Sequence, residues 1–294
     1  MKEGLGAKAI AGIVNRWISR EVQWAEVKRV KLLGLEEIAL KKGHRDFVMM
    51  GTGRSVSGEV KVLAVLPDRK KPTVNCFGET LPRRIRRAIC TVCTDMYEGF
   101  ILAVKEGLGK AQVVIDRYPV AKLYRAGADR LRTQELRRLK PELPTADYAK
   151  LTGAMWPFRK KAVALAVEEQ ALLARLFTYT PALPQAYEYR EQLTGIFDAP
   201  LSKDAALLQL TAWQRRVRAS GLSCYDSFLQ TREKWREEIA NYFLARQNSG
   251  FVAGLNNKIQ VLKRRCYGIF NRSHLFQRLF LDLEGSQRFA PTGA

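Results

Sequence analysis

The sequence predicts an α/β core that is interrupted by a long helical insertion and completed by further helices. Three observations predict this fold class. The first 115 residues contain five short apolar segments with the length and β-branched composition of strands. Residues 120–245 have an almost purely helical pattern, rich in Leu, Ala, Arg, Glu and Lys. A further helical pattern covers about 251–265.

The first 66 residues predict one helix and three strands. Residues 5–29 are predicted to be helical, because Ile10, Ile13, Val14 and Trp17 recur at helical spacing. The period then changes, and strands are predicted at 33–38, 46–50 and 60–66. The glycines of 51–53 and 57–58 indicate a turn region between the last two strands.

The next segment alternates helices with strands. Pro82 is predicted to open a short basic helix, since proline fits the first helical turn. A fourth strand is predicted at 88–92, with the segment ending at Asp95, and a helix is predicted at 97–108. The fifth strand, 111–115, ends at Asp116. The predicted order is therefore β-β-β-α-β-α-β before the helical block.

The helical block is divided by prolines, which interrupt helices. We expect breaks near five of them: Pro141, Pro144, Pro181, Pro184 and Pro200.

Composition points to a polyanionic partner. The chain of 294 residues has 50 Lys and Arg against 29 Asp and Glu, a formal net charge of +21. Such a protein repels itself unless a polyanion is near, and nucleic acid is the simplest polyanion. A merely basic or ribosome-adjacent enzyme is the alternative. We expect no transmembrane helix, no signal peptide and no membrane partner.

Cysteine and histidine usage excludes several classes of site. Five cysteines, an odd number in a long chain, argue against a disulfide framework and fit a reducing cytoplasm. With only two histidines, a zinc enzyme or a Ser-His mechanism is disfavoured.

Three acidic residues lie in or directly after predicted strands. They are Glu36, Asp95 and Asp116. The ends of adjacent strands in an α/β sheet converge on one edge, where ligands bind. Carboxylates gathered there call for a cation, and ligation by oxygen alone suits Mg²⁺. The alternative is that isolated acids at strand ends are ordinary solvated turn residues.

The helical wheel of 251–265 has an unexpected gap. Its apolar face is formed by Val252, Leu255, Ile259 and Leu262. On the other face, Ala253 lies in the middle of a polar cluster of Asn257, Gln260 and Arg264. A small residue there suggests a missing functional side chain. The alternative is that alanine, the best helix former, needs no special reason.

Four segments, 34–45, 94–96, 114–117 and 249–271, resemble bacterial insertion-sequence transposases of the ISL-three family. The resemblance covers nearly the whole chain, and its longest segment begins Ser-Gly-Phe-Val-Ala-Gly-Leu-Asn-Asn. It implies an RNase H-like core with a mixed five-stranded sheet and a large helical insertion before the last core helix. It also implies a DDE active site with two Mg²⁺ ions, and movement of an element that has terminal inverted repeats.

The resemblance also implies a division into domains. Residues 1–30 match part of a helix-turn-helix region and 31–119 match the RNase H-like core. Residues 120–245 match the helical insertion, and 246–294 match the C-terminal helices that complete the core. Family members begin with a zinc-binding segment and a full helix-turn-helix, so we expect an N-terminally shortened copy.

The match to the family's active site is incomplete. The first catalytic Asp is replaced by Glu36, the second is Asp95, and Ala253 stands where the third carboxylate is expected. Glu36 and Asp95 are therefore the expected Mg²⁺ ligands. Asp116 keeps the acid of an Asp-x-x-His motif, but Pro119 replaces its histidine. Together with Asn257 and Arg264, Asp116 is expected near the site.

These changes predict impaired catalysis. Glutamate in place of aspartate displaces a carboxylate by roughly one C–C bond, ~1.5 Å, whereas a metal site tolerates ~0.2 Å. Ala253 removes a ligand, and the loss of one member of a catalytic unit commonly costs ~10³-fold or more.

Two basic runs are the expected DNA contacts, because phosphates dominate the affinity of proteins for DNA. They comprise Arg83, Arg84, Arg86, Arg87, Lys263, Arg264 and Arg265. Taken singly, such runs are more often solvated faces.

The sequence therefore predicts a transposase that acts on double-stranded DNA at terminal inverted repeats, in the bacterial cytoplasm and associated with the nucleoid. The alternatives are a catalytically silent DNA-binding protein and, less favoured, an RNase H-like nuclease. A homo-oligomer is compatible with the sequence.

Overall fold

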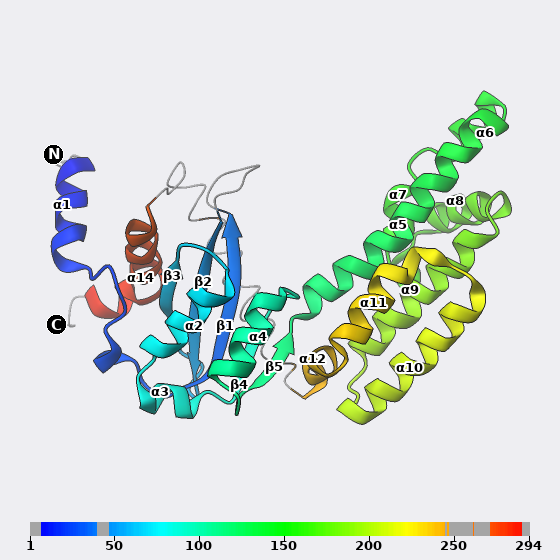
Figure 1. Cartoon of the computed structure of the whole chain (residues 1–294). Coiled ribbons are helices and arrows are strands. Elements are labelled where there is room, and N and C mark those ends of the chain that lie inside the picture. Colours follow the sequence, from blue (N-terminus) through cyan, green and yellow to red (C-terminus); the bar gives the residue numbers. More distant parts are fainter. Residues whose placement is uncertain (1–6, 40–46, 245, 247–260, 262–270, 290–294) are drawn as a thin grey trace. The chain divides into compact units, whose positions relative to one another are not determined.

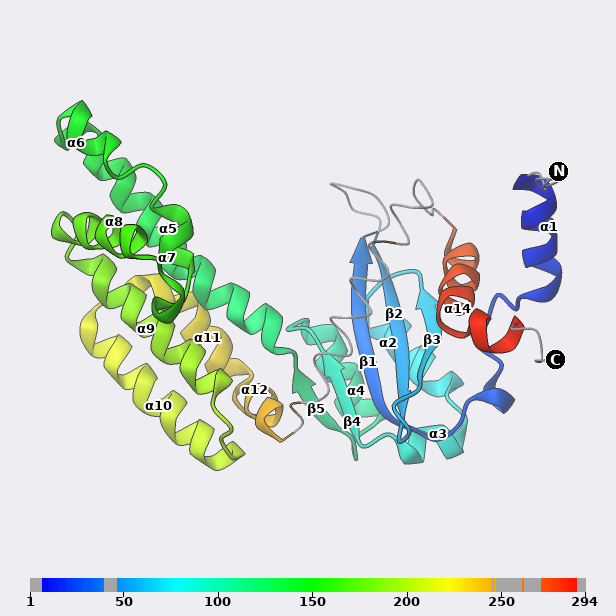
Figure 2. The same cartoon turned by 180° about the vertical axis from the view of Figure 1, so that it is seen from behind.

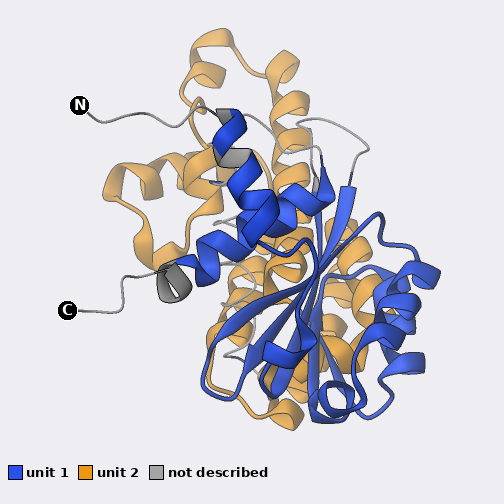
Figure 3. Cartoon of the chain, turned by 90° about the vertical axis from the view of Figure 1, so that its left-hand side faces the viewer, with its two compact units in different colours: residues 1–115, 246–294 blue, residues 116–245 orange. Residues whose placement is uncertain are grey.

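The computed structural model of the chain describes residues 7–39, 47–244, 246, 261 and 271–289. The chain divides into two compact units (Figure 3). Unit 1 comprises Met1–Ile115 and Arg246–Ala294, and unit 2 comprises Asp116–Ala245.

Unit 1 is built around a mixed five-stranded sheet in the order β3-β2-β1-β4-β5 (Figure 1). The strands are β1 Val30–Ala39, β2 Phe47–Ser55, β3 Val60–Leu66, β4 Thr91–Thr94 and β5 Gln112–Ile115. The first three form an antiparallel meander, and β4 and β5 run parallel to β1. This order and these directions are those of an RNase H-like core, so the predicted fold class is confirmed.

Helices cover both faces of the sheet. Among the described residues of unit 1 the helices are α1 Ala7–Trp17, η1 Trp24–Glu26, α2 Lys71–Thr80, α3 Arg83–Ala88, α4 Glu98–Gly107 and α14 Arg272–Phe289. Leu33 and Leu35 of β1 line a small cavity together with residues of α2 and α4. Ile38, whose side chain points to the opposite face, packs in a cluster with Leu275 and Leu279 of α14. Figure 2 shows α14 beside β3.

Several predicted element boundaries were wrong. Residues 5–29 do not form one helix: α1 ends at Trp17, and only the short η1 follows. The fourth strand begins at Thr91 and not at Ala88, which is the last residue of α3. Helix α2, Lys71–Thr80, was not predicted, because Pro72 and Gly78 are residues that often interrupt helices. Helix α14 was not predicted as a separate element either.

The predicted turn at 51–53 is part of strand β2, which continues to Ser55. Its glycines serve close packing. A Cβ on Gly51 would lie 3.0 Å from the Phe77 ring, and one on Gly53 would lie 3.0 Å from Leu63 and from Val30. The glycines therefore allow neighbouring side chains to approach the strand. The real turn is short and includes Gly58, which has a φ of 86°.

All regular secondary structure in the described residues of unit 2 is helical. Its α-helices are α5 Arg117–Glu142, α6 Thr145–Ala149, α7 Met155–Arg159, α8 Val167–Thr178, α9 Ala182–Asp198, α10 Lys203–Ser220, α11 Asp226–Lys234 and α12 Arg236–Ala240. Short 3₁₀ segments are η2 Ala162–Ala164, η3 Ser223–Tyr225 and η4 Asn241–Phe243.

The core of unit 2 is aromatic. Trp213 of α10 is fully buried and makes edge-to-face contacts with Tyr225 and Phe228, at centroid distances of 5.4 and 5.5 Å. Tyr124 of α5 is also fully buried and meets Phe228 at 5.7 Å. Such pairs add to the stabilisation that burial of their surface provides.

Prolines do not end every helix near them. Pro141 lies inside the last turn of α5, and Pro184 lies in the first turn of α9. Among the described residues, no helix combines the length and apolarity needed to cross a bilayer.

Candidate active site

The register of the sheet brings Glu36 and Asp95 to neighbouring positions. In the parallel pairing of β1 with β4, Leu35 is opposite Thr94, the last residue of β4. Glu36 and Asp95 each come one residue later. Both are half-buried. The sheet therefore places the first two predicted acids side by side at the carboxyl end of β4.

Asp95 is an ionisable group in a partly desolvated position. Burial raises the pKa of Asp95 above its usual value, although the Tyr97 amide and the charge of Arg69 both act to lower it. The backbone N–H of Tyr97 donates a hydrogen bond to Oδ1 of Asp95 at 2.9 Å. This bond orients the carboxylate. A bound cation would offset the unfavourable burial of its charge.

Glu37 and Arg69 are neighbours of Asp95 that the sequence analysis did not identify. Arg69 Nη1 donates to Oε2 of Glu37 at 2.6 Å. The same guanidinium lies 4.3 Å from the centre of the Tyr97 ring. Arg69 thereby ties the β3–α2 loop to β1 and to the turn that carries Asp95.

The electrostatics of Glu37 connect it to the same site. Burial raises the pKa of Glu37; the charge of Arg69 lowers it, and the charge of Asp95 raises it further. The adjacent acids 36 and 37 and the basic run 69–71 were visible in the sequence. Only the fold shows that Arg69 faces Glu37.

Asp116 follows Ile115 of β5, which is paired with Thr94, and it is the first residue of unit 2. Its carboxylate caps α5, accepting the backbone N–H of Tyr118 at 3.2 Å. Burial raises the pKa of Asp116, against hydrogen bonds from the Tyr118 and Arg117 amides. The observed role of Asp116 is therefore that of a helix cap.

Five predicted site residues lie outside the residues that the structure describes. They are Ala253, Asn257, Lys263, Arg264 and Arg265.

The basic residues of α3 divide into two groups. Arg84 donates to the carbonyls of Val27, at 2.8 Å, and Trp24, and Arg86 donates to the carbonyl of Glu79 at 3.0 Å. These two side chains hold the backbone of unit 1 together. Arg83 and Arg87 are exposed, and no ion pair joins either of them to a described carboxylate.

The donor set fits one magnesium ion. Mg²⁺ is commonly held by one or two carboxylates and otherwise by water and substrate phosphates, and Glu36 and Asp95 directly follow the paired residues Leu35 and Thr94, so two carboxylates are attached at neighbouring backbone positions. Within the described part of the chain, no group of three or more His, Cys, Asp or Glu residues is arranged to hold a metal.

A mixed sheet of this order, with one acid inside β1 and another directly after the adjoining strand β4, defines a protein of the RNase H-like class. The sequence model of the ISL-three family, described as transposase, matches residues 33–279. The chain therefore belongs to the ISL-three family of transposases, as the sequence motifs predicted.

A curated relative is the transposase for insertion sequence element IS1001 of Bordetella parapertussis. It is 26% identical over 274 residues, which cover 92% of this chain. The chain spans 64% of the length of that relative.

Proposed function

We propose that this protein is a transposase that binds the ends of an insertion sequence and that its Mg²⁺-dependent DNA cleavage and strand transfer are impaired. The observation that carries the proposal is the register of β1 with β4, which makes Glu36, in β1, a neighbour of Asp95, directly after β4. Family membership and the similarity to a transposase for an insertion sequence element support the choice of DNA.

In this proposal Glu36 and Asp95 hold the metal. Mg²⁺, when bound, lowers the pKa of an attacking water or 3′-hydroxyl and stabilises the leaving oxygen of a phosphodiester. Asp95 contributes a carboxylate whose orientation is fixed by the Tyr97 amide. Arg69 steadies this turn through the Tyr97 ring and Glu37. Asp116, Asn257 and Arg264 are proposed to lie near the site.

The proposed impairment rests on two substitutions relative to the family pattern. Glu36 is one methylene longer than aspartate, and it is attached to strand β1, which is paired with β2 at Glu36 itself and with β4 up to Leu35. The strand cannot shift to compensate for ~1.5 Å without breaking those ladders. Ala253 supplies no carboxylate at the third position.

DNA binding is supported by charge. Unit 1 has 29 Lys and Arg against 14 Asp and Glu, a net charge of +15. Arg83 and Arg87 present exposed guanidinium groups on α3. We propose these, with Arg84 and Arg86 in part and with Lys263, Arg264 and Arg265, as phosphate contacts.

The test is restoration of the family's acids. The substrate is linear DNA that carries the inverted repeats mapped on either side of the gene, with Mg²⁺ or Mn²⁺ present. We expect little nicking by the wild-type chain and an increase of ~10³-fold in the Glu36→Asp, Ala253→Glu double variant. Adding Asp95→Ala to that variant must abolish the gain. Robust cleavage by the wild-type chain that Asp95→Ala removes would contradict the impairment.

A second candidate function is DNA binding without catalysis. The absence of a carboxylate at Ala253, combined with the positive charge of unit 1, favours it. In that case the double variant binds the repeats as tightly as the wild-type chain but still does not cut them. Electrophoretic mobility shifts and cleavage measured on the same DNA separate the two functions.

A further inference from the structure

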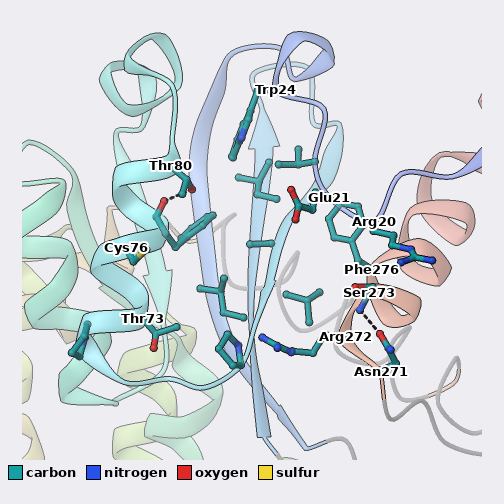
Figure 4. A pocket seen from close by; sticks show the side chains of 18 residues that line it. Arg20, Glu21, Trp24, Thr73, Cys76, Thr80, Asn271, Arg272, Ser273 and Phe276 are labelled. Carbon is teal, nitrogen blue, oxygen red and sulfur yellow. Dashed lines mark hydrogen bonds between the residues drawn. The ribbon is translucent and has the colours of Figure 1, made fainter. Parts of the chain in front are cut away.

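The outer edge of β3 forms the floor of a groove of about 1050 Å³ in unit 1 (Figure 4). Five consecutive residues, from Leu63 to Pro67, line it. Side chains of a strand alternate between the two faces of its sheet. An unbroken run of lining residues therefore means that the groove faces the backbone edge of β3. Strand β3 is the outermost strand on this side of the sheet.

Two helices on opposite faces of the sheet form two walls of the groove, and the segment 20–24 lines it as well. One wall is a single side of α2, represented by Thr73, Cys76 and Phe77. The other is the first turns of α14, with Arg272 and Phe276. Figure 4 shows the two walls on either side of the strand. The groove is therefore a slot whose floor is a strand edge and whose two walls each include an aromatic ring.

The floor offers hydrogen-bonding groups. The backbone of 63–66 pairs with β2 on its inner side, and it forms no other backbone hydrogen bond to a described residue. The register shifts between Ala64 and Val62, so that Leu63 is an extra residue and the regular ladder runs through Ala64, Val65 and Leu66. N–H and C=O groups on an open edge are a template for an added strand.

The charges around the groove favour an acidic occupant. Arg20 and Arg272 line it, and Glu21 is the one carboxylate among its described lining residues. Neither arginine forms an ion pair with a described carboxylate. The charge of Arg272 reaches Asp68, which already accepts hydrogen bonds from Thr73 at 2.7 Å and from the Lys70 amide at 2.9 Å.

We propose that this groove binds an extended, apolar peptide segment with acidic flanks from a partner protein, which adds a strand to the edge of β3. An added strand would be covered on both faces, by α2 and by α14, so its central residues must be apolar on both sides. Main-chain hydrogen bonds supply affinity, and the walls select the side chains.

A nucleic-acid strand fits the groove less well. The floor and inner walls are apolar, with Leu63, Leu66, Phe77 and Phe276 among the lining residues. Phosphates need several cations along their path, whereas the groove has two arginines and an opposing glutamate. A peptide matches the regular spacing of donors and acceptors on β3.

The probe is a fluorescein-labelled synthetic peptide of about nine residues, long enough for one strand. It has a central run of valine and isoleucine and acidic ends. Binding to the full chain is measured by fluorescence anisotropy. Two further peptides carry N-methyl groups on alternate residues. In one peptide the methylated amides lie on the inward edge, which would face β3, and in the other they lie on the outward edge. We expect saturable binding, and a loss of about tenfold or more when the inward edge is methylated but not the outward edge.

Two protein variants locate the site. Cys76→Trp fills the groove from an exposed position of α2 and is expected to abolish binding. Its matched control is Cys90→Trp, at an exposed cysteine that does not line the groove. The double variant Arg20→Glu, Arg272→Glu is expected to lose the acidic peptide and to bind a basic-ended version instead. Thermal unfolding checks that each variant is folded.

Four results would overturn the proposal. They are no saturable binding of the acidic peptide, equal binding of both N-methylated peptides, unchanged binding by Cys76→Trp, and no charge preference in the arginine double variant. If Cys76→Trp weakens binding of duplex or single-stranded DNA while no peptide binds, the groove is a nucleic-acid site.

Discussion

The two units use their charged residues differently. Within the described residues, the buried arginines are Arg132, Arg190 and Arg232, all in unit 2. Arg190 donates to the carbonyls of Phe158 and Lys160, and its guanidinium lies 4.3 Å from the centre of the Tyr187 ring. Unit 1 keeps Arg83 and Arg87 exposed. Positive charge in unit 2 thus serves packing in part, whereas in unit 1 more of it is available to a partner.

Acidic residues show the same contrast. Burial raises the pKa of Asp95 in unit 1, and no described cation forms a direct pair with it. In unit 2, burial also acts to raise the pKa of Asp129, but hydrogen bonds from Arg159 and Arg132 outweigh it and the pKa is lowered. Asp129 stabilises its unit as a carboxylate. Asp95 carries an unfavourable charge, as expected of a cation ligand.

The largest effect is expected where two backbones meet in unit 2. A Cβ on Gly127 of α5 would lie 2.2 Å from the carbonyl oxygen of Cys224. The backbones of Gly127 and Cys224 cannot move apart without displacing the helices to which they belong. Gly127→Ala should therefore lower the free energy of unfolding by about 3 kcal/mol or more. Hydrogen exchange should show the loss in unit 2 and leave the sheet of unit 1 protected.

Gly195 provides the matched control for Gly127. It also lies in a helix of unit 2, but a Cβ there meets nothing within 4 Å. Gly195→Ala should stabilise the helix by about 0.5–1 kcal/mol. Equal effects of the two substitutions would show that helix propensity, rather than the contact with Cys224, decides both.

Arg190→Met tests whether buried arginines stabilise unit 2. The substitution keeps much of the side-chain volume but removes the donors to the carbonyls of Phe158 and Lys160. Leaving such acceptors unsatisfied should cost about 2–3 kcal/mol in urea unfolding. The exposed Arg175 of the same unit is the control, and Arg175→Met should change stability by less than about 0.5 kcal/mol. A neutral Arg190→Met would remove the basis of the comparison.

The sequence was sufficient to predict the five strands and the helical block, because strand composition and helical periodicity are local properties. It failed where tertiary contacts override local preference. Gly51 and Gly53 are typical of a turn, yet they lie in β2 because Phe77, Leu63 and Val30 need the space. Helix α2 contains Pro72 and Gly78, which often interrupt helices, yet it forms with Val74 and Phe77 buried.

The sequence supplied candidate site residues, and they stay predictions. Glu36 and Asp95 follow from strand ends and family motifs, and the register of β1 with β4 makes them neighbours. Glu37 and Arg69 were missed, because their ion pair joins residues 32 positions apart through a loop whose path no motif specifies. Predictions for Ala253, Asn257 and Arg264 stay predictions, because those residues lie outside the described part of the chain.

Asp95→Asn tests the energetic cost of the candidate site. Because the pKa of Asp95 is raised in the folded chain, the protonated form is favoured by folding, and stability is lost as pH rises through the folded pKa. Asp95→Asn should therefore stabilise unit 1 by about 0.5–2 kcal/mol at neutral pH without metal. The difference should vanish below the usual pKa of 3.8.

Added Mg²⁺ tests whether the destabilising charge of Asp95 belongs to a metal site or is an ordinary buried carboxylate. If Asp95 binds the ion, millimolar Mg²⁺ should raise the melting temperature of the wild-type chain and leave that of Asp95→Asn unchanged.

Asp198 of unit 2 is the control for the pH dependence of Asp95→Asn. Burial acts to raise its pKa, but hydrogen bonds from Lys161 and Arg117 lower it overall. Asp198→Asn should therefore destabilise at neutral pH and become neutral in acid.

The smallest effects are expected on α3, where neighbouring arginines have different surroundings. Arg87 is exposed, so Arg87→Gln should leave the free energy of unfolding unchanged within about 0.5 kcal/mol. If Arg87 contacts a phosphate, the slope of log affinity for duplex DNA against log salt should become shallower by about one. Fluorescence anisotropy over a series of salt concentrations measures this slope.

Arg84→Gln is the counterpart on the same helix turn. Arg84 donates to the carbonyls of Val27 and Trp24, so its loss should lower the stability of unit 1 by about 1 kcal/mol. Its donors are already engaged, so the salt slope should change less than in Arg87→Gln. If the two variants change the slope equally and neither changes stability, both arginines act through net charge alone. In that case, arginines that hold the fold together cannot be told apart from arginines that are available to a partner within unit 1. The comparison of the two units depends on that distinction.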